Sequence, residues 1–269
     1  MKAEATPKLH SWAAYYSPVN RWAVKVLTRN LFVFRKTWTT NLAFNIIEPL
    51  LYLAALGAGL GMLVDDIEGM SYTQFIAPGI IATSAMWAAA AECSYDSFVR
   101  MHYQKIYHAI VATPISLREV VVGELLYGTF KSVLSGTVIM GVIAALGLVP
   151  SLWALLTPFV LIINGMVFSQ LAMIWTGIVP KIDNFAYFFT MIITPMFLFS
   201  EVFFPLDVLP QILQQLAWVL PLYHIVVLLR SLTLGLMEIN LVFHLLWLLV
   251  FILVIFPLPQ YLMHRRLIK

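Results

Sequence analysis

The sequence predicts an all-α integral membrane protein with six transmembrane helices. Of its 269 residues, 61% are hydrophobic and only 11% are charged, and the mean hydropathy is +0.89. An average soluble domain is about one quarter charged, so this chain has too few polar side chains to cover a globular surface. Its length accommodates about six segments of roughly 20 residues, each long enough to cross a hydrocarbon core of about 30 Å.

The first 40 residues form a separate unit in this prediction, an N-terminal tail followed by an amphipathic helix on the membrane surface. Arg21, Lys25 and Arg29 recur every four residues, and Trp22 begins a neighbouring apolar stripe. That pattern is typical of a helix that turns its basic side chains toward lipid head groups. The alternative is an ordinary basic segment that only orients the protein. Residues 41–269 are the predicted transmembrane domain.

The apolar runs place the spans at about 42–64, 72–95, 120–146, 152–179, from 185 onward, and 239–262. Two capping boxes, Ser71 to Gln74 and Ser116 to Glu119, open the second and third spans. The first span contains Gly57 and Gly61, a spacing that lets another helix approach closely.

Four prolines interrupt the region after the fifth span begins: Pro195, Pro205, Pro210 and Pro221. Each removes a backbone donor and breaks or kinks a helix. The apolar stretches between them are too short to cross a membrane. We therefore expect a re-entrant or interfacial helical hairpin at about 206–236, shielded by protein or water.

Basic residues predict the topology. Seven Lys and Arg residues lie in the N-terminal segment, and Arg100, Lys105 and Arg118 lie in the loop predicted at 96–118, whereas the opposite side has only Arg230. Because cytoplasmic loops carry the excess of Lys and Arg, both termini are expected in the cytoplasm.

Five charged residues fall within or beside the predicted spans: Glu48, Glu92, Asp96, Glu124 and Lys131. Each needs a partner or water, because a charge at the centre of a membrane helix costs about 2.5–3.5 kcal/mol. Glu124 and Lys131 are about 10 Å apart along one helix, too far to pair directly. Salt bridges between helices are the main interpretation. A proton relay through Glu48, Glu92 and Glu124 is the alternative, and it would make the chain a proton-coupled secondary transporter.

The loop at 96–118 contains a short amphipathic helix in this prediction. Tyr103, Ile106, Tyr107 and Ile110 form an apolar stripe at helical spacing, with polar residues on the other side. Such a helix fits the groove of a partner protein. A helix resting on head groups is the alternative.

Catalytic signatures are missing from the sequence. It has no HExxH, GxSxG, paired-cysteine or P-loop motif, and its single cysteine, Cys93, is interpreted as a buried apolar residue. The chain is therefore not expected to be an enzyme, to bind a metal or to hydrolyse ATP itself. Its many aromatic residues predict an interfacial belt or, alternatively, a platform for stacking sugars.

These segments resemble the permease subunits of the ABC-2 superfamily of exporters, and within it the NodJ-type permeases associated with export of nodulation lipo-chitooligosaccharides. The resemblance covers nearly the whole chain, and its most specific stretches lie at 57–61, 77–86, 122–124, 194–200, 204–210 and 220–224. It departs from the family pattern at Ser200 to Phe203, where Glu201 adds an acid near the outer gate.

The resemblance implies a homodimer in a bacterial inner membrane, working with two copies of a separate ABC ATP-binding subunit that carries ATP and Mg²⁺. It implies no cofactor in this chain and no nucleic-acid partner. The expected cargo is an amphipathic glycolipid, lipooligosaccharide or similar lipid-linked molecule, moved by alternating access. The implied coupling helix at 100–114 would dock on the ATP-binding subunit through Arg100, Tyr103, Lys105, Tyr107, His108, Thr113 and Pro114. The implied outer hairpin, with its gate, would include Glu201, Phe204, Pro205, Asp207, Pro210 and Pro221.

Overall fold

The computed structural model describes residues 16, 21–64, 66–67, 69–236 and 240–268, with all of their side chains except those of 39–46 and 58. The predicted N-terminal tail and the predicted start of the last span at 239 lie outside these residues. Regular elements in the described part are helices, apart from an isolated bridge between Ile67 and Met70. The α-helices are α1 (Trp22–Tyr52), α2 (Tyr72–Ala91), α3 (Ile106–Val111), α4 (Leu117–Ala145), α5 (Thr157–Ile178), α6 (Phe185–Phe188), α7 (Thr194–Phe199), α8 (Gln211–Ala217), α9 (Pro221–Leu234), α10 (Leu241–Ile255) and α11 (Pro257–Leu267).

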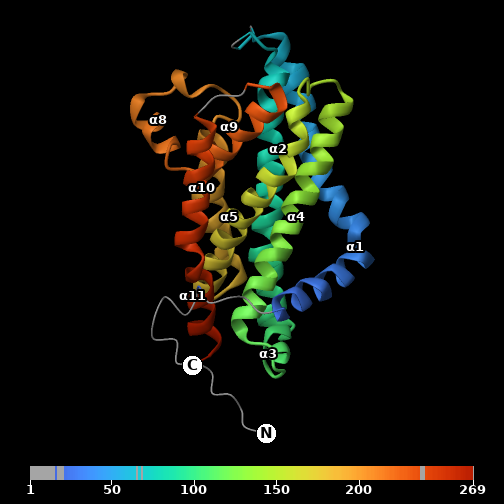
Figure 1. The fold of residues 1–269 in the computed structure, drawn as a ribbon, viewed down its shortest axis with the longest axis vertical. Coiled ribbons are helices and arrows are strands. Elements are labelled where there is room, and N and C mark those ends of the chain that lie inside the picture. The colour runs from blue at the N-terminus through green and yellow to red at the C-terminus, as the bar shows by residue number, and fades with distance from the viewer. Residues whose placement is uncertain (1–15, 17–20, 65, 68, 237–239, 269) are drawn as a thin grey trace.

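Five continuous helical stretches in the described chain are long and apolar enough to cross a membrane: Tyr72–Tyr103, Leu117–Ala145, Leu152–Ile178, Ile182–Phe199 and Leu241–Leu267. The bent pair α8 and α9 makes a sixth if it counts as one span. The long helices run side by side, with the start of α1, α3 and the end of α11 at one end of the bundle and α8 and α9 at the other (Figure 1). We call these the α3 end and the α8 end.

Helix α1 joins the predicted surface helix to the predicted first span. It is helical throughout, and its first half slants away from the bundle before the second half climbs along it (Figure 1). The boundary predicted at residue 40 therefore falls inside a continuous helix. Ile47–Met62 is the apolar part of this segment, and it ends in a π-helical stretch (Leu53–Gly59) and a 3₁₀ turn (Leu60–Met62). Gly57 packs there against Thr73 at the start of α2, whose hydroxyl donates to the Gly57 carbonyl at 3.0 Å.

The second span is longer than the sequence predicted. The helix continues past Tyr95 through two π-helical stretches, Glu92–Asp96 and Val99–Tyr103. Lys105 then adopts a left-handed backbone conformation with φ 55°, which breaks the chain direction before α3. The predicted helix over 100–114 is thus wrong in extent: its first residues complete α2, and α3 itself has six residues.

Both predicted capping boxes are confirmed. Ser71 accepts a hydrogen bond from the Gln74 backbone while the Gln74 side chain accepts one from the Ser71 backbone, and Ser116 and Glu119 repeat the arrangement. Each box satisfies two of the backbone donors that a helix start leaves without partners. The starts of α2 and α4 are therefore determined locally.

Helix α4 lies at the centre and packs closely on its neighbours through glycines. A Cβ atom added to Gly123 would come within 2.6 Å of the Val26 Cβ on α1, and one added to Gly128 would collide with Ser169 on α5 and with Cys93 in the π-helical stretch after α2. Larger residues would push these helices apart. The Ser135 hydroxyl of α4 also pairs with the Ser84 hydroxyl of α2 at 2.8 Å.

The predicted hairpin appears as two helices that meet at 81°. Pro210 precedes α8 and Pro221 occupies the first turn of α9, where a missing backbone donor costs nothing. Most of α9 is buried within the bundle, whereas α8 protrudes at the α8 end (Figure 1). Whether the hairpin re-enters the membrane stays a prediction.

Candidate functional site

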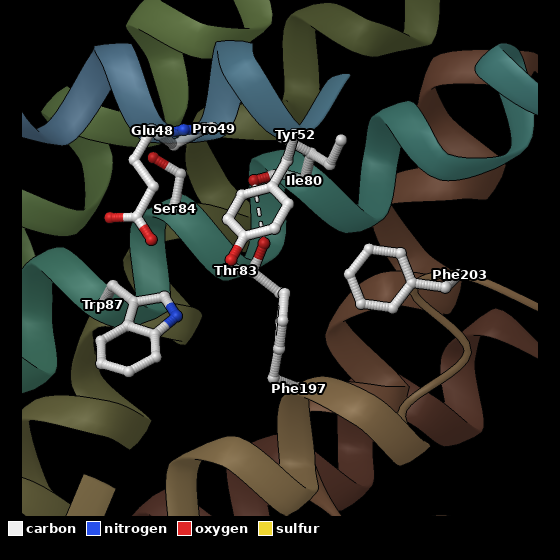
Figure 2. Close-up of a pocket in the computed structure, with 9 residues that line it drawn as sticks. All are labelled: Glu48, Pro49, Tyr52, Ile80, Thr83, Ser84, Trp87, Phe197 and Phe203. Carbon is white, nitrogen blue, oxygen red and sulfur yellow. Dashed lines mark hydrogen bonds between the residues drawn. The ribbon is translucent and has the colours of Figure 1, made fainter. Parts of the chain in front are cut away.

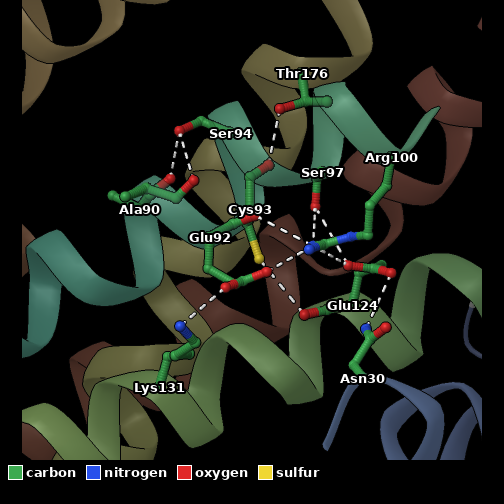
Figure 3. Close-up of polar contacts among 11 residues, drawn as sticks. Asn30, Ala90, Glu92, Cys93, Ser94, Ser97, Arg100, Glu124, Lys131 and Thr176 are labelled. Atoms are coloured by element: carbon green, nitrogen blue, oxygen red, sulfur yellow. Dashed lines mark hydrogen bonds and ion pairs between the residues drawn. The ribbon is translucent and has the colours of Figure 1, made fainter. Parts of the chain in front are cut away.

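Four charged side chains meet inside the bundle near the α3 end. On α2 and its π-helical extension, Arg100 Nη2 lies 2.6 Å from Glu92 Oε1; it also lies 2.6 Å from Glu124 Oε2 on α4. Lys131, also on α4, lies 3.4 Å from the other oxygen of Glu92. Figure 3 shows the Arg100 guanidinium between the two carboxylates. We call these four residues the ion-pair cluster.

Polar side chains attach the cluster to a third helix. Asn30 of α1 donates to Glu124 Oε1 at 3.1 Å, and Ser97 donates to Glu124 Oε2 at 3.4 Å. Helices α1, α2 and α4 thus share one set of contacts, as Figure 3 shows. A shift of any one of these helices must rearrange the polar contacts of the other two.

The cluster is buried and formally neutral. The Glu124 side chain is fully buried and the Arg100 side chain is 15% exposed. Two carboxylates balance two cations, which offsets the large cost of removing charges from water. Residues in such a cluster depend on one another, because deleting one cation leaves a carboxylate buried without its charge partner.

The sequence analysis placed these charges in the right region but missed their pairing. Salt bridges between helices were expected, and Glu124 and Lys131 do not pair directly. The partner that links the two carboxylates is Arg100, which was assigned to a loop. Asp96 is exposed and stands outside the cluster, and Glu48 lies in a different hollow. No contact in the described chain joins Glu48 to Glu92 or Glu124, so the geometry does not support the proton relay.

Helix α3 packs on α4 and on the Val99–Tyr103 stretch, the two segments that carry Glu124 and Arg100. Tyr107 is fully buried beneath α3. Burial raises the pKa of its hydroxyl well above the usual range, and the Glu124 carboxylate shifts the pKa in the same direction, so Tyr107 stays neutral. Tyr107 connects the exposed surface of α3 to the interior charges.

Arg100 and Tyr107 therefore differ from the expectation that they lie on a docking surface. Both side chains point into the bundle: Arg100 pairs with the carboxylates of Glu92 and Glu124, and Tyr107 is fully buried. The other residues assigned to that surface are exposed: Tyr103, Lys105, His108, Thr113 and Pro114.

A small hollow opens between α1, α2 and α7 (Figure 2). Glu48 reaches into it from α1 beside Ser84 and Trp87 of α2. Further aromatic rings line it: Tyr52 packs edge-on against Phe197 at 6.1 Å, and Phe197 packs against Phe203 at 4.8 Å between centroids. The hollow combines an acid with aromatic faces, a lining that suits an amphipathic molecule.

At the α8 end, Glu201 pairs with Arg230 of α9, with Oε1 and Nη1 2.6 Å apart. Arg230 also donates to the Glu201 carbonyl and lies 4.0 Å from the centre of the Phe75 ring on α2. Glu201 has a left-handed φ of 60°, unusual for a residue with a Cβ. The residues predicted to form the gate follow in the segment that leads to α8, namely Phe204, Pro205, Asp207 and Pro210, and Pro221 is buried.

Sequence reasoning missed a histidine pair at this end. The Nδ1 atoms of His224 on α9 and His244 on α10 are 2.7 Å apart, and His224 Nε2 lies 2.9 Å from the Trp218 carbonyl. A carbonyl only accepts, so His224 Nε2 carries a proton and His224 Nδ1 accepts from His244 Nδ1. The two residues are 20 apart in sequence on different helices, and no motif connects them.

Comparison with known proteins gives consistent matches. The model of a family described as ABC-2 type transporter matches residues 23–234. Nodulation protein J of Rhizobium leguminosarum bv. viciae is 39% identical over 244 residues, covering 91% of this chain and 94% of that protein. Nodulation protein J of Rhizobium meliloti (strain 1021) is 36% identical over 259 residues, covering 95% and 99%. The inner membrane transport permease YadH of Escherichia coli (strain K12) is 25% identical over 205 residues, covering 75% and 78%.

Proposed function

The chain belongs to the ABC-2 type transporter family, as a multi-pass membrane permease, and from this premise we propose how it works. We propose that it is the membrane subunit of an ATP-driven exporter whose ATP and Mg²⁺ are bound by a separate subunit. One observation carries the proposal: the ion-pair cluster joins three helical segments, and helix α3 packs on two of them, α4 and the Val99–Tyr103 stretch that contains Arg100. Such an arrangement can transmit a push on α3 into the membrane domain.

Docking of the ATP-binding subunit on α3 is supported by the exposure of its outer face. Lys105 and His108 face outward beside Tyr103, and Thr113 and Pro114 follow at the end of the helix. Tyr107 anchors the same helix to the interior. The proposed partner surface therefore has an acidic rim for Lys105 and a groove for the exposed aromatic side chain.

In the proposed mechanism, closure of two ATP-binding subunits presses on α3 in each copy of a homodimer. Tyr107 and Arg100 then move relative to Glu124 on α4. The hydrogen bond from Asn30 to Glu124 breaks, which releases α1 from α4. The second half of α1 changes its position against α2 as a result. Access to the transport pathway alternates between the two membrane faces.

The hollow around Glu48 is the proposed part of the pathway in this chain. Ile47, Leu51 and Tyr52 leave an exposed apolar face on α1 beside it. A second copy of the chain packed on this face would close the hollow. The aromatic rings would contact the sugar or acyl portion of a glycolipid or lipid-linked cargo.

The α3 end is proposed to face the cytoplasm of a bacterium, with the chain in the inner membrane. The described basic residues at this end include Lys25, Lys105, Arg265 and Arg266, whereas Arg230 at the α8 end is paired with Glu201. The positive-inside rule supports this orientation.

The test is co-expression of the full chain with its ATP-binding subunit, followed by affinity purification and an ATPase assay. The double variant Lys105→Glu, His108→Glu is expected to lose most of the co-purified subunit and its ATPase activity, because the acids would repel the acidic rim. Lys181→Glu, an exposed charge reversal between α5 and α6, is the matched control and is expected to retain both. Equal co-purification of all three proteins would contradict docking on α3.

A further inference from the structure

Two hollows adjoin along the first half of α1 at the α3 end. The first has a volume of about 230 Å³ and lies between α1, the helical stretch after α2, α3 and α4. Its lining includes Arg29, Asn30, Val33, Asp96, Arg100 and Gln104. The second, of about 580 Å³, follows one face of α1, and its lining includes Lys25, Arg29, Phe32, Val33 and Lys36. Arg29 and Val33 belong to both, so we treat them as one continuous groove, the α1 groove.

Arg29 has an unfulfilled hydrogen-bonding requirement in this groove. Its Nη1 atom is buried, with no hydrogen-bond partner among the described residues. A buried guanidinium donor normally has an acceptor, and an anion satisfies its charge as well. Arg100, the other arginine of the groove, also has a buried Nε atom without a partner, but its charge is already balanced by Glu92 and Glu124. The open position for an anion is therefore at Arg29.

The charges around Arg29 favour an anion further. Lys25 and Lys36 flank it on α1, and Asp96 is the one acid among the described lining residues. With Arg100 neutralised by its own two carboxylates, three cations remain against one carboxylate. Asn30 and Gln104 add polar groups beside Arg29.

Apolar surface continues from this polar region. Phe32 is 64% exposed and Val33 is 53% exposed, side by side on the same helix. A small inorganic anion would leave both in contact with water. A lipid would cover them with its acyl chains while its phosphate reached Arg29, as in basic pockets that bind lipid head groups.

We propose that the α1 groove binds an anionic phospholipid of the adjacent leaflet, with its phosphodiester on Arg29 and its acyl chains along Phe32 and Val33. The lipid occupies the space between α1 and the end of α2, beside the ion-pair cluster. It is a part of the membrane domain that stabilises the position of α1, distinct from the transported cargo. The site does not require the proposed ATP-driven mechanism.

The test is a lipid titration of the delipidated full chain in mild detergent, followed by native mass spectrometry. Phosphatidylglycerol is expected to bind at least about tenfold more tightly than phosphatidylcholine, because charge-assisted hydrogen bonds to the partly buried Arg29 guanidinium add to the attraction of the flanking lysines. Arg29→Gln is expected to lose about tenfold in phosphatidylglycerol affinity. Arg35→Gln, an exposed arginine of α1 that lines neither hollow, is the matched control and is expected to lose less than twofold.

Three results would overturn the proposal. Equal losses in the two variants would mean that the lipid senses only general basic charge on α1. Equal affinity for the two lipids would exclude recognition of the negative charge. Displacement of the lipid by millimolar inorganic phosphate would assign the site to a free anion.

Asp96→Asn gives an independent measurement if Arg29→Gln does not fold. It removes the one acid from the described lining and leaves every cation in place, so phosphatidylglycerol is expected to bind about threefold to tenfold more tightly. An unchanged affinity for phosphatidylglycerol would contradict lipid binding in the α1 groove. Neither lipid measurement uses the ATP-binding subunit, so a failure here is separate from a failure of the transport proposal.

Discussion

The two ends of the bundle bury charge in different ways. At the α3 end, Arg100 connects Glu92 to Glu124, and α1 joins the set through Asn30. At the α8 end, Glu201 and Arg230 form one pair between the segment after α7 and α9. The first arrangement joins four charged side chains and links three long helices, whereas the second is one charge pair that fixes a local turn to α9, with Phe75 of α2 beside it.

This difference determines how each end responds to a change. In a connected polar network, every member depends on the others, and removing a central member affects all of them. The Glu201–Arg230 pair is smaller, since its one further connection runs from Arg230 to the Phe75 carbonyl and ring on α2. The α3 end is therefore expected to rearrange as a unit, which suits a coupling region, whereas the α8 end can lose one contact and keep the remainder.

The largest effect is expected for Arg100→Met. It leaves Glu92 without its closer cation and removes the cation that pairs with Glu124, and breaking a buried charge pair costs about 3–5 kcal/mol. Thermal unfolding of the purified chain, followed by its intrinsic fluorescence, should show a large drop in melting temperature or loss of folded protein.

The double variant Arg100→Met, Glu124→Gln is the control for charge imbalance. It removes one carboxylate along with the cation, so part of the lost stability should return. A double variant as unstable as Arg100→Met alone would show that Arg100 acts through packing instead of charge.

A smaller effect is expected for Arg230→Gln at the α8 end. Glu201 is partly exposed and can gain water when Arg230 is removed, so about 1–3 kcal/mol of stability should be lost. Melting temperatures of Arg230→Gln and of Arg230→Gln, Glu201→Gln measure the pair. If Arg230→Gln destabilised the chain as much as Arg100→Met, the contrast between the two ends would fail.

The smallest effect is expected for His244→Phe. It retains an aromatic ring against Trp218 but removes the donor to His224 Nδ1, at a cost of about 1 kcal/mol for the lost hydrogen bond. The melting temperature should fall slightly and protein yield should stay the same. A fall larger than that of Arg230→Gln would indicate that the histidine pair, not the ion pair, holds the α8 end together.

Features with local causes could be predicted from the sequence. The capping box at Ser116 and Glu119 involves residues that are three apart in sequence. The apolar run that becomes α5 is long enough by itself to predict a membrane span. The prolines marked the break around α8 for the same reason, since each acts on its own backbone. Membership in the transporter family followed from the motifs that these local segments carry.

The pairing of charges could not be predicted, because it depends on how helices are rotated against one another. Glu92 and Arg100 are eight residues apart, and two π-helical stretches change the rotation at the end of α2. Arg100 also counted as a loop residue, since basic charge marks the membrane boundary. Its burial requires the carboxylate of Glu124, which α4 supplies from 24 residues away.

Each π-helical turn holds one residue more than an α-helical turn would. At the end of α2, the stretches Glu92–Asp96 and Val99–Tyr103 therefore store surplus chain length inside a helix that is otherwise regular. Releasing one surplus residue would rotate everything beyond it by about 100° and shift it by about 1.5 Å, the screw step of an α-helix. Arg100 would then face away from Glu124 without any change in the helices above, so the membrane domain contains a built-in step of fixed size.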